Sequence, residues 1–378
     1  MKKKEFLSLG LMTGTSMDGL DLSLIKTDGY NEFSSIFNKY YEFDEKLHRK
    51  LINLRQRLNS HEDLKKYSDD LDSLEREITL FHSKKISNLT KKYNIDLIGF
   101  HGQTIFHSSK ERISKQLGNG KLLSQLTKTL VVDSFREKDI LNNGQGAPLS
   151  PIFHKVISRH LKKLNKISLP TNILNIGGIS NVTKIFEDKN NKKLDFMALD
   201  IGPGNCLIDS WIRKNSHKKY DKDGLIGKTG KIDYLILNQA IENFDNISYG
   251  ESLDVSDFDI SFAKGLSLED GCATLTEFSA YLIAKGIDYI DKKDNNFTKN
   301  NLVCGGGRKN IFLIDAINKN LKNAKLENID QFGLDGDFIE SQCFGYLAVR
   351  RFLNLPISFP NTTGCNMPTI GGTINKNF

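Results

Sequence analysis

The segment LMTGTSMDGLD (Leu11–Asp21) brings small, hydroxyl-bearing and acidic residues together in one short stretch. We expect Gly14, Thr15 and Ser16 at a tight turn between two strands. A phosphate group needs donors without crowding; Gly lets backbone N–H groups approach it, and the two hydroxyls add more. The segment predicts a phosphate-binding turn; the alternative is an ordinary hairpin turn, in which these residue types are common.

Two carboxylates of the same segment indicate a metal ion. Asp18 and Asp21 would repel a phosphate unless a divalent cation lay between them. Mg²⁺ is usually held by few carboxylates and keeps several of its waters. We therefore expect Asp18 and Asp21 to bind Mg²⁺, in part through water.

A second glycine-bearing segment, LDIGPGNCLID (Leu199–Asp209), contains a candidate general base. Asp200 is expected at the end of an apolar strand, followed by a Gly-Pro-Gly turn and a helix that starts near Asn205. Open N–H groups at a helix start favour a phosphate contact, and a carboxylate at a strand end can take a proton. The alternative for Asp200 is a carboxylate that caps a turn.

A third cluster, CGGGRKN (Cys304–Asn310), is expected between a strand and a helix. The missing side chains of Gly305, Gly306 and Gly307 would let a flat ring such as adenine lie against the backbone. A tight strand–helix turn would explain the same glycines. Neither G-x-x-x-x-G-K-[ST] nor G-x-G-x-x-G is present, which disfavours P-loop and Rossmann proteins. Cys304 ends an apolar run without a nearby His, so we interpret it as a small strand residue.

The framework for these motifs is predicted from hydrophobic periodicity. The chain opens with an antiparallel set of strands, two amphipathic helices follow between Asp44 and Tyr93, and a helix follows Pro148 and Pro151. The strands are expected at residues 6–12, 20–27, 33–43, 97–104 and 130–135.

After Pro170 the opening pattern returns, with an apolar strand, a glycine-bearing turn and further strands at 172–178, 182–186 and 196–205. This weak duplication predicts two similar α/β domains, residues 1–170 and 171–378, facing one another across a cleft. The second half adds a strand at 302–307 and helices near 270–292, 309–321 and 338–354, the last a candidate to pack back on the first domain. The polar region 215–265 is expected to hold ligand-responsive loops.

The composition indicates a water-soluble globular protein of a reducing compartment. The chain has 378 residues, a formal net charge of +7 and no apolar run long enough to span a bilayer. Its lysines alternate with acidic residues and its aromatic residues do not interleave with basic ones, so we expect no nucleic-acid partner. The five cysteines contain no C-x-x-C pair, which disfavours a structural zinc site. We expect a cytoplasmic protein that does not bind membranes.

Six motifs in order carry a family resemblance. They are GLMTGTSMDGLD (Gly10–Asp21), GFHGQTIFH (Gly99–His107), NGQGAPLSP (Asn143–Pro151), NIGGISNVT (Asn175–Thr183), LDIGPGNCLID and CGGGRKN. On these residues the chain resembles the anhydro-N-acetylmuramic acid kinases, relatives of hexokinase, actin and the Hsp70 ATPase domain. The resemblance implies two similar actin/hexokinase-like (ribonuclease H-like) domains around an ATP cleft, and a homodimer.

The resemblance also implies a reaction. ATP and Mg²⁺ would be bound, the 1,6-anhydro bond of anhydro-N-acetylmuramic acid would be opened by water, and O6 would be phosphorylated. The products are N-acetylmuramic acid 6-phosphate and ADP, formed in peptidoglycan recycling and amino-sugar catabolism. The family's catalytic carboxylate matches Asp200, which would activate the attacking water. Ordinary glycoside hydrolysis needs a second acid for the leaving oxygen, whereas here the phosphorus centre accepts it.

The resemblance assigns further residues to two groups of ligand contacts. The ATP and phosphate contacts would be Gly14, Thr15, Ser16, Met17, Asp18, Gly19, Leu20, Asp21, Gly177, Gly178, Gly202, Gly204, Asn205, Gly305, Gly306 and Gly307. The sugar contacts would be His101, Gln103, Arg136, Asp139, Gln145 and Glu340, with Arg136 suited to the lactyl carboxylate. His101 as a hydrogen-bonded strand-end histidine, and Glu340 as a helix-start residue that interacts with the dipole, are the alternatives.

The chain departs from the family pattern at D-F-R-x-x-D. Ser134 stands where the first acid is expected, and the basic residue within the motif is a lysine, Lys138. Lys lacks the bidentate fork of Arg, so substrate breadth is the property affected. Two other functions fit the residues: a kinase for another amino sugar, which would incorporate no water at C1, and a non-catalytic ATP-binding sensor, which would tolerate Asp200→Asn.

Overall fold

The computed structural model describes residues 4–108, 110–244, 249, 252–293 and 296–378. The chain divides into two compact units. The first unit contains the residues up to His160 together with Phe338–Phe378, and the second contains Leu161–Asp337. The C-terminal segment thus groups with the N-terminal half of the chain.

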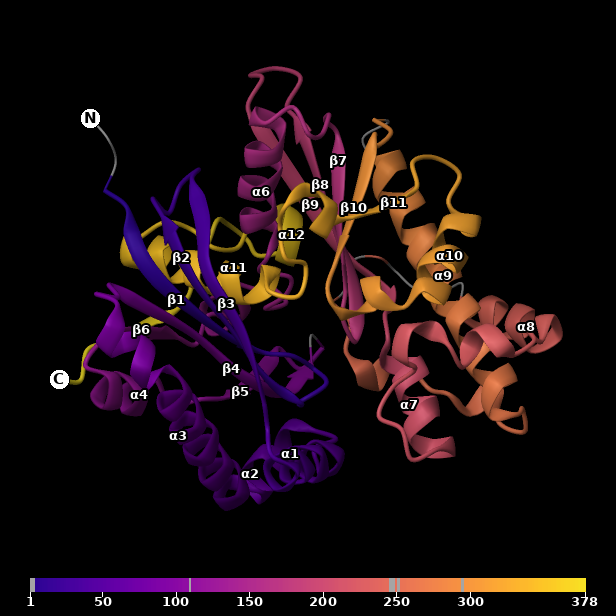
Figure 1. The fold of residues 1–378 in the computed structure, drawn as a ribbon, viewed down its shortest axis with the longest axis horizontal. Helices are drawn as coiled ribbons and strands as arrows, with labels where there is room; N and C mark the ends of the chain where they lie inside the picture. The colour runs from indigo at the N-terminus through magenta and orange to yellow at the C-terminus, as the bar shows by residue number, and fades with distance from the viewer. Residues whose placement is uncertain (1–3, 109, 245–248, 250–251, 294–295) are drawn as a thin grey trace. The chain divides into compact units, whose positions relative to one another are not determined.

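The sheet of the first unit begins with an antiparallel trio and continues in parallel (Figure 1). Its strands lie in the order β12-β6-β4-β1-β2-β3, with β5 paired to β4. β1–β2 and β2–β3 are antiparallel, β1–β4 and β4–β6 are parallel, and β12 runs antiparallel to β6. The bounds are β1 Phe6–Thr13, β2 Gly19–Thr27, β3 Phe33–Glu42, β4 Leu97–Ser108, β5 Ile113–Leu117, β6 Leu130–Asp133 and β12 Thr373–Asn375.

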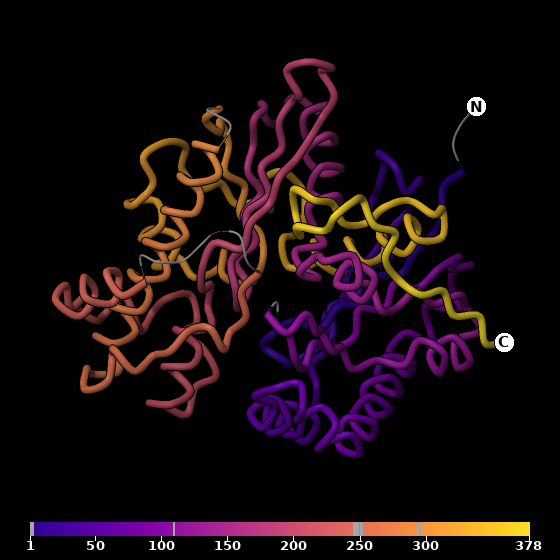
Figure 2. Tube along the Cα trace, turned by 180° about the vertical axis from the view of Figure 1, so that it is seen from behind, coloured from indigo at the N-terminus to yellow at the C-terminus, as the bar shows by residue number. Residues whose placement is uncertain are grey.

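Helices cover both faces of this sheet. On one face, leucines of β1 and β2 pack with Ile86 of α3 and Leu123 of α4. On the other face, α11 contacts β1, β2 and β4, and Figure 2 shows the yellow C-terminal segment along the indigo and purple elements of this unit. The helices are α1 Glu45–Arg57, α2 His61–Lys66, α3 Ser68–Lys92, α4 Gly120–Thr127, α5 Glu137–Leu141, α6 Pro151–Lys163, α11 Ile339–Phe352 and α12 Pro360–Thr363.

The predicted helices between Asp44 and Tyr93 are corrected in one respect. Three helices occupy the segment, because a capping box at Ser60 starts the short α2. The capping interaction satisfies backbone donors that a continuous helix would have used internally, so the chain breaks there. The strands predicted for the first half and the helix after Pro151 are confirmed.

The close packing of α11 on the sheet depends on Gly10 of β1. A Cβ atom built on Gly10 would lie 1.8 Å from the carbonyl oxygen of Ser341. Hydroxyl groups add hydrogen bonds across the same contact, from Ser8 Oγ to the carbonyl of Gly345 at 2.8 Å and between Ser23 Oγ and Ser341 Oγ at 2.7 Å. The sheet and the start of α11 are thereby held in fixed register.

The sheet of the second unit repeats the central topology of the first. Its order is β11-β10-β7-β8-β9. β7–β8 and β8–β9 are antiparallel, whereas β7–β10 and β10–β11 are parallel. The predicted α/β fold of two similar domains is confirmed at this level. The bounds are β7 Thr171–Ile176, β8 Ile179–Glu187, β9 Leu194–Pro203, β10 Asn300–Cys304 and β11 Leu326–Asn328.

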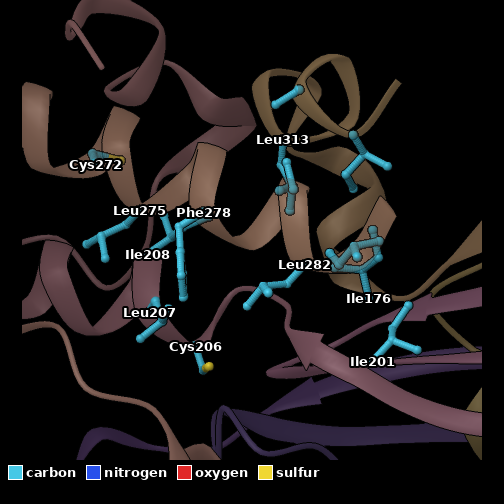
Figure 3. Packing of buried hydrophobic residues seen from close by; sticks show 14 of the residues in the cluster. Ile176, Ile201, Cys206, Leu207, Ile208, Cys272, Leu275, Phe278, Leu282 and Leu313 are labelled. Atoms are coloured by element: carbon cyan, nitrogen blue, oxygen red, sulfur yellow. The ribbon is translucent and has the colours of Figure 1, made fainter. Parts of the chain in front are cut away.

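One face of the second sheet carries the helices and the core of this unit. Figure 3 shows Ile176 and Ile201 of the strands on the side of Leu282 of α9, with Phe278 of the same helix beside Leu207 and Ile208 of α7. The helices are α7 Cys206–Asn215, α8 Tyr234–Phe244, α9 Leu268–Lys293 and α10 Ile311–Asn320. The region 215–265, expected to hold loops, contains α8 and several 3₁₀ turns; its residues 245–248 and 250–251 lie outside the described part.

Candidate active site

A row of four side chains crosses the second sheet on the face away from its helices. Strand register aligns Cys304 with Asn175, Asn175 with Asn181, and Asn181 with Asp200. The preceding or following strand residues, such as Leu174 and Val182, belong to the helix-facing core, and successive side chains alternate between faces. The glycine turn after Cys304 and the candidate base Asp200 therefore lie at the two ends of one row.

Asp200 is a buried carboxylate with a fixed orientation. It lies within β9, three residues before the strand ends, and is 8% exposed. The backbone N–H of Leu253 donates to its Oδ2 at 2.9 Å. A bulge between Asp200 and Gly202 leaves Ile201 without a register partner, so the strand bends where the Gly-Pro-Gly turn begins.

The start of α7 is already engaged by the preceding hairpin turn. The N–H groups of Gly204 and Cys206 donate to the carbonyl of Gly178 at 2.8 and 3.2 Å, and that of Asn205 donates to Gly177 at 2.8 Å. The expectation of open N–H groups is therefore wrong for residues 204–206. These hydrogen bonds fasten the two glycine turns of the second unit to one another beside Asp200.

The Gly305–Gly307 turn keeps an open surface. Gly305 has a φ of 81°, a left-handed conformation that favours glycine. A Cβ atom on Gly306 would meet no atom within 4 Å. The turn lies between β10 and α10, as predicted, and a planar ring has room against Gly306.

Arg308 fastens this turn to the end of the second unit. Its side chain is 3% exposed. It donates from Nη1 to Asp337 at 2.5 Å and to the carbonyl of Gly305 at 3.1 Å, and from Nη2 to Asp330 at 3.0 Å. The N–H of Gly305 also donates to the carbonyl of Gly336 at 3.0 Å. Sequence reasoning missed Arg308, because a Lys/Arg pair after glycines is equally typical of an exposed turn.

In the first unit, the Gly14–Asp18 turn presents its hydroxyl residues outward. Thr15 and Ser16 are exposed, and Ser16 Oγ donates to Asp18 Oδ1 at 2.6 Å. Met17 has a φ of 57°, and its buried side chain packs among α1 and α3. The side chain of Met17 therefore anchors the turn, and a phosphate contact at this residue stays a prediction.

Leu20 of this segment and Gln103 of β4 also have structural contacts. Leu20 is buried in the core beneath the sheet, so its side chain cannot reach a phosphate. Gln103 Nε2 donates to the carbonyl of Gly14 at 3.0 Å, while its Oε1 is buried and accepts no hydrogen bond from the described residues. Gln103 thus holds the Gly14–Asp18 turn in place, while its Oε1 lacks a donor among the described residues.

The buried His101 and the half-buried Arg136 are hydrogen-bonded to one another. Arg136 Nε and Nη2 donate to His101 Nε2 at 3.2 and 3.0 Å, and His101 Nδ1 donates to the carbonyl of Gly102 at 2.8 Å. Burial, with a smaller contribution from the Arg136 charge, lowers the pKa of His101 well below its usual value. His101 is therefore neutral, and both ring nitrogens hold protein groups; it lies within β4 and not at a strand end.

Asp139 organises the loop next to this pair. Its side chain is fully buried; Oδ2 accepts from the N–H of Gly146 at 2.7 Å and Oδ1 from Thr363 Oγ1 at 2.7 Å. Arg136 Nη1 donates to the carbonyl of the same Gly146 at 2.6 Å, and the N–H of Gln145 donates to the carbonyl of Thr363 at 2.9 Å. Because both carboxylate oxygens accept internal hydrogen bonds, Asp139 positions the loop, and its direct contact with the sugar stays a prediction. Thr363 had no signal in the sequence.

Glu340 lies in the first turn of α11 and is half-buried. Burial raises the pKa of the nearby Cys343 thiol; the Glu340 charge raises it further, and Arg136 acts in the opposite direction. Glu340 and Arg136 are thus both close enough to act on one group of α11, and the ring of His101 packs against Phe344 of the same helix.

Ser134 and Lys138, the two departures from the family pattern, lie next to the Arg136–Asp139 contacts in sequence. Ser134 has a φ of 52°, a backbone conformation in which Asp and Asn are enriched. The adjacent Asp133 accepts hydrogen bonds from Gly120 and Asn375, and burial raises its pKa. Lys138 is exposed on α5. Neither change touches the Arg136–Gly146–Asp139 contacts.

The residues present fit a phosphate with a divalent cation better than an all-protein metal site. Within the described ranges, no group of three or more His, Cys, Asp or Glu side chains could hold a metal ion. Asp18 and the half-buried Asp21 supply carboxylates on either side of Gly19. A cation held by two carboxylates, waters and phosphate oxygens is the usual arrangement for Mg²⁺.

Fold and site together define a class: a duplicated α/β protein whose strand-end turns combine glycines, hydroxyls and a buried carboxylate, as in phosphate-transferring enzymes. The family model for anhydro-N-acetylmuramic acid kinase matches residues 6–377, and the chain belongs to this family. The resemblance carried by the six motifs is thereby confirmed.

Similar proteins support this assignment. The anhydro-N-acetylmuramic acid kinase of Pelagibacter ubique (strain HTCC1062) is 50% identical over 381 residues, covering 100% of both chains. That of Zymomonas mobilis is 36% identical, covering 98% of this chain and 99% of its own. Among solved structures, glucokinase from Balamuthia mandrillaris with glucose covers 92% of this chain and 94% of its own, with a TM-score of 0.36 and 10% identity, a likeness too distant to bear on function. No helix among the described residues is long and apolar enough to cross a membrane.

Proposed function

We propose that this protein is an ATP-dependent kinase that opens 1,6-anhydro-N-acetylmuramic acid with water and phosphorylates O6. Its products would be N-acetylmuramic acid 6-phosphate and ADP, in peptidoglycan recycling. The observation that carries the proposal is the buried, oriented Asp200 at one end of a polar row whose other end is the open glycine turn, in a chain matched by the family over nearly its full length.

Asp200 is the proposed general base. Its Oδ2 is fixed by the N–H of Leu253, so the carboxylate does not have to reorganise when water arrives. It would take one proton as the water oxygen attacks C1. The oxygen O6 leaves with its electron pair and is captured by the γ-phosphoryl group of ATP, so a second acid is not required.

The phosphate contacts are proposed for the outward-facing Thr15 and Ser16 and for the backbone around Gly14. Mg²⁺ would be held by Asp18 and Asp21, where it would neutralise phosphate charge. Gly306 offers the open surface for the adenine ring. The phosphate and sugar contacts thus belong mainly to the N-terminal domain, and the base and nucleotide-ring contacts to the C-terminal domain.

Arg136 is the proposed partner of the lactyl carboxylate. His101 and the carbonyl of Gly146 fix its guanidinium group, and a preorganised guanidinium binds a carboxylate with little loss of entropy. Gln145 and Glu340 are the remaining candidates for sugar hydroxyls. We further propose a cytoplasmic homodimer, which sedimentation at micromolar concentration would check by a mass near twice that of the chain.

The test is a sugar-dependent assay of ADP formation. The protein is incubated with Mg²⁺-ATP and either anhydro-N-acetylmuramic acid or N-acetylmuramic acid, which has no anhydro ring. The proposal requires ADP and a 6-phosphorylated sugar from the anhydro substrate in equal amounts. Phosphorylation of the ring-opened sugar alone would replace the proposal with an ordinary amino-sugar kinase. ATP binding without turnover of either sugar would favour a sensor.

A further inference from the structure

Asn181 is the neighbour of Asp200 on the adjacent strand. The two residues are register partners in β8 and β9, so their side chains lie on the same face of the sheet, with Cβ atoms typically about 4.5–5.5 Å apart in such pairs. This face is the one turned away from the helices. Any small molecule that contacts the Asp200 carboxylate from this face also lies near the Asn181 carboxamide.

The carboxamide oxygen of Asn181 lacks a donor. Oδ1 is buried and accepts no hydrogen bond from any described residue. A buried polar atom without a partner is destabilising, and such atoms in native proteins usually have a partner such as water or a ligand. Beside a general base, the missing donor is a molecule that is present during the reaction.

The proposed chemistry supplies such a donor, and this inference rests on the proposed function. Water has two O–H bonds. As its oxygen forms the bond to C1, one proton passes to Asp200 and the C1–O6 bond breaks, with O6 taking the γ-phosphoryl group of ATP. The second proton stays on the new hydroxyl at C1 and needs an acceptor throughout.

We propose that Asn181 is a catalytic residue whose Oδ1 accepts the second O–H of the attacking water while Asp200 removes the first. Two acceptors fix the water in orientation, so its lone pair is directed at C1. Asn181 does not exchange a proton. Neutral at every pH, it orients the water without raising the proton affinity of Asp200 as a second carboxylate would.

Ser180 provides the matched control. It precedes Asn181 on β8, it is fully buried, and its Oγ also has no partner among the described residues. Its register partner is Gly202, and it points to the opposite face, where its Oγ lies 3.0 Å from a Cβ built on Gly204. Ser180→Ala therefore removes an equally buried, equally unpaired polar group that does not face Asp200.

The experiment compares water with methanol as the nucleophile. Methanol has one O–H, which Asp200 takes, and a methyl group where water has its second hydrogen. The reaction then gives the methyl glycoside 6-phosphate. The intact enzyme is assayed with anhydro-N-acetylmuramic acid and Mg²⁺-ATP at a fixed methanol fraction, and the ratio of methyl glycoside to free sugar phosphate is measured by mass spectrometry.

For Asn181→Leu, which keeps the number and branching of the side-chain heavy atoms, kcat for hydrolysis should fall roughly threefold to tenfold, the worth of one neutral hydrogen bond. The methyl glycoside ratio should rise by the same factor, with the KM for ATP unchanged. Asn181→Asp keeps an acceptor, so it should retain the wild-type ratio at high pH, with its pH–kcat profile displaced to higher pH by the paired carboxylates. Ser180→Ala should alter neither quantity.

An unchanged ratio in Asn181→Leu would overturn the inference. Asn181→Ala is assayed alongside, because its smaller side chain makes room for methanol. A methyl glycoside ratio that rises in Asn181→Ala and not in Asn181→Leu would overturn the inference as well. A higher KM for ATP with an unchanged ratio would overturn it by assigning Asn181 to the nucleotide. A wild-type enzyme that forms no phosphorylated sugar would overturn the proposed function and this inference together, whereas an active wild type with unaffected variants overturns this inference alone.

Discussion

The two units use the same strand order and sense, but their first hairpins differ. In the first unit, residues 14–18 connect β1 and β2 and expose Thr15 and Ser16. In the second, Gly177 and Gly178 alone connect β7 and β8, and the start of α7 closes on them. The two units thus share a topology and differ in the length of this turn. The longer turn of the first unit can surround a ligand, whereas the two-residue turn of the second stiffens the strand that carries Asp200.

The units also differ in how a helix reaches the sheet. In the first, Gly10 of β1 admits the backbone of α11; in the second, Gly286 of α9 lies against Ile201, with a built Cβ 2.4 Å from the Ile201 Cβ. The space is therefore made by the sheet in one unit and by the helix in the other. The same layered fold is achieved with different residues, so the duplication is visible in topology and weak in sequence.

The largest expected effect is on kcat, and it compares Asp200 of β9 with Tyr40 of β3, the matching strand of the first unit. Register places Asp200 beside Asn181 in β9, and Tyr40 beside Asp21 in β3. Asp200→Asn removes the proposed base and should lower kcat by about 10²–10⁴, whereas Tyr40→Phe should leave it within about twofold. Steady-state ADP formation checks both; a fully active Asp200→Asn would exclude this residue as the base.

The next effect concerns the two close helix–sheet contacts. Gly10→Ala places a methyl group against backbone that cannot rotate away, so we expect at least about 3 kcal/mol of destabilisation. Gly286→Ala places its methyl group against the Ile201 Cβ, which is fixed to the backbone; because alanine's helix propensity offsets about 1 kcal/mol, its cost should be smaller. Chemical denaturation measures both; equal losses would show that the contacts are equivalent after all.

Acid should weaken the first unit before the second. Burial lowers the pKa of His82 to about 4 and of His154 to about 3, and that of His101 well below the usual value. Because the unfolded chain binds more protons below pH 6.5, this stability is complete above pH 6.5 and is lost as the pH falls toward each folded pKa. The sequence has one histidine between residues 161 and 337, His217, and it is exposed.

For His82 alone, the free energy of unfolding should fall by about 2 kcal/mol between pH 7 and pH 5. His82→Leu should reduce the pH dependence by that amount, and His217→Leu should not change it. Denaturant titrations at the two pH values provide the comparison. An identical pH slope in both variants would mean that His82 titrates normally in the folded protein.

The smallest predicted effect concerns the glycine turn of the second unit. Arg308→Gln removes the ion pairs that tie the turn to Asp330 and Asp337. We expect the KM for ATP to rise about tenfold, which corresponds to the loss of one charge-assisted hydrogen bond. The KM for the sugar should not change. Lys309→Gln is the control, since Lys309 is exposed and its ammonium group pairs with the carboxylate of Asp337. Equal effects of the two variants would assign the loss to surface charge.

Much of this framework could be predicted from the sequence. The strand–glycine–strand pattern indicated both sheets, because apolar alternation and turn residues are local signals. The contacts of Met17, Leu20 and Asp139 were not predictable, since each depends on residues remote in sequence that pack against or donate to them. Likewise, the engagement of the α7 amides follows from a bulge and a two-residue turn, which composition does not reveal.

The most direct test of the central claim uses ¹⁸O-labelled water. The enzyme, anhydro-N-acetylmuramic acid and Mg²⁺-ATP are combined in labelled water, and the sugar phosphate is analysed at once by mass spectrometry, before C1 exchanges with solvent. We predict one ¹⁸O at C1, none in the phosphate, and no product from Asp200→Asn at the same time point. A phosphorylated sugar without label at C1 would contradict water attack assisted by Asp200.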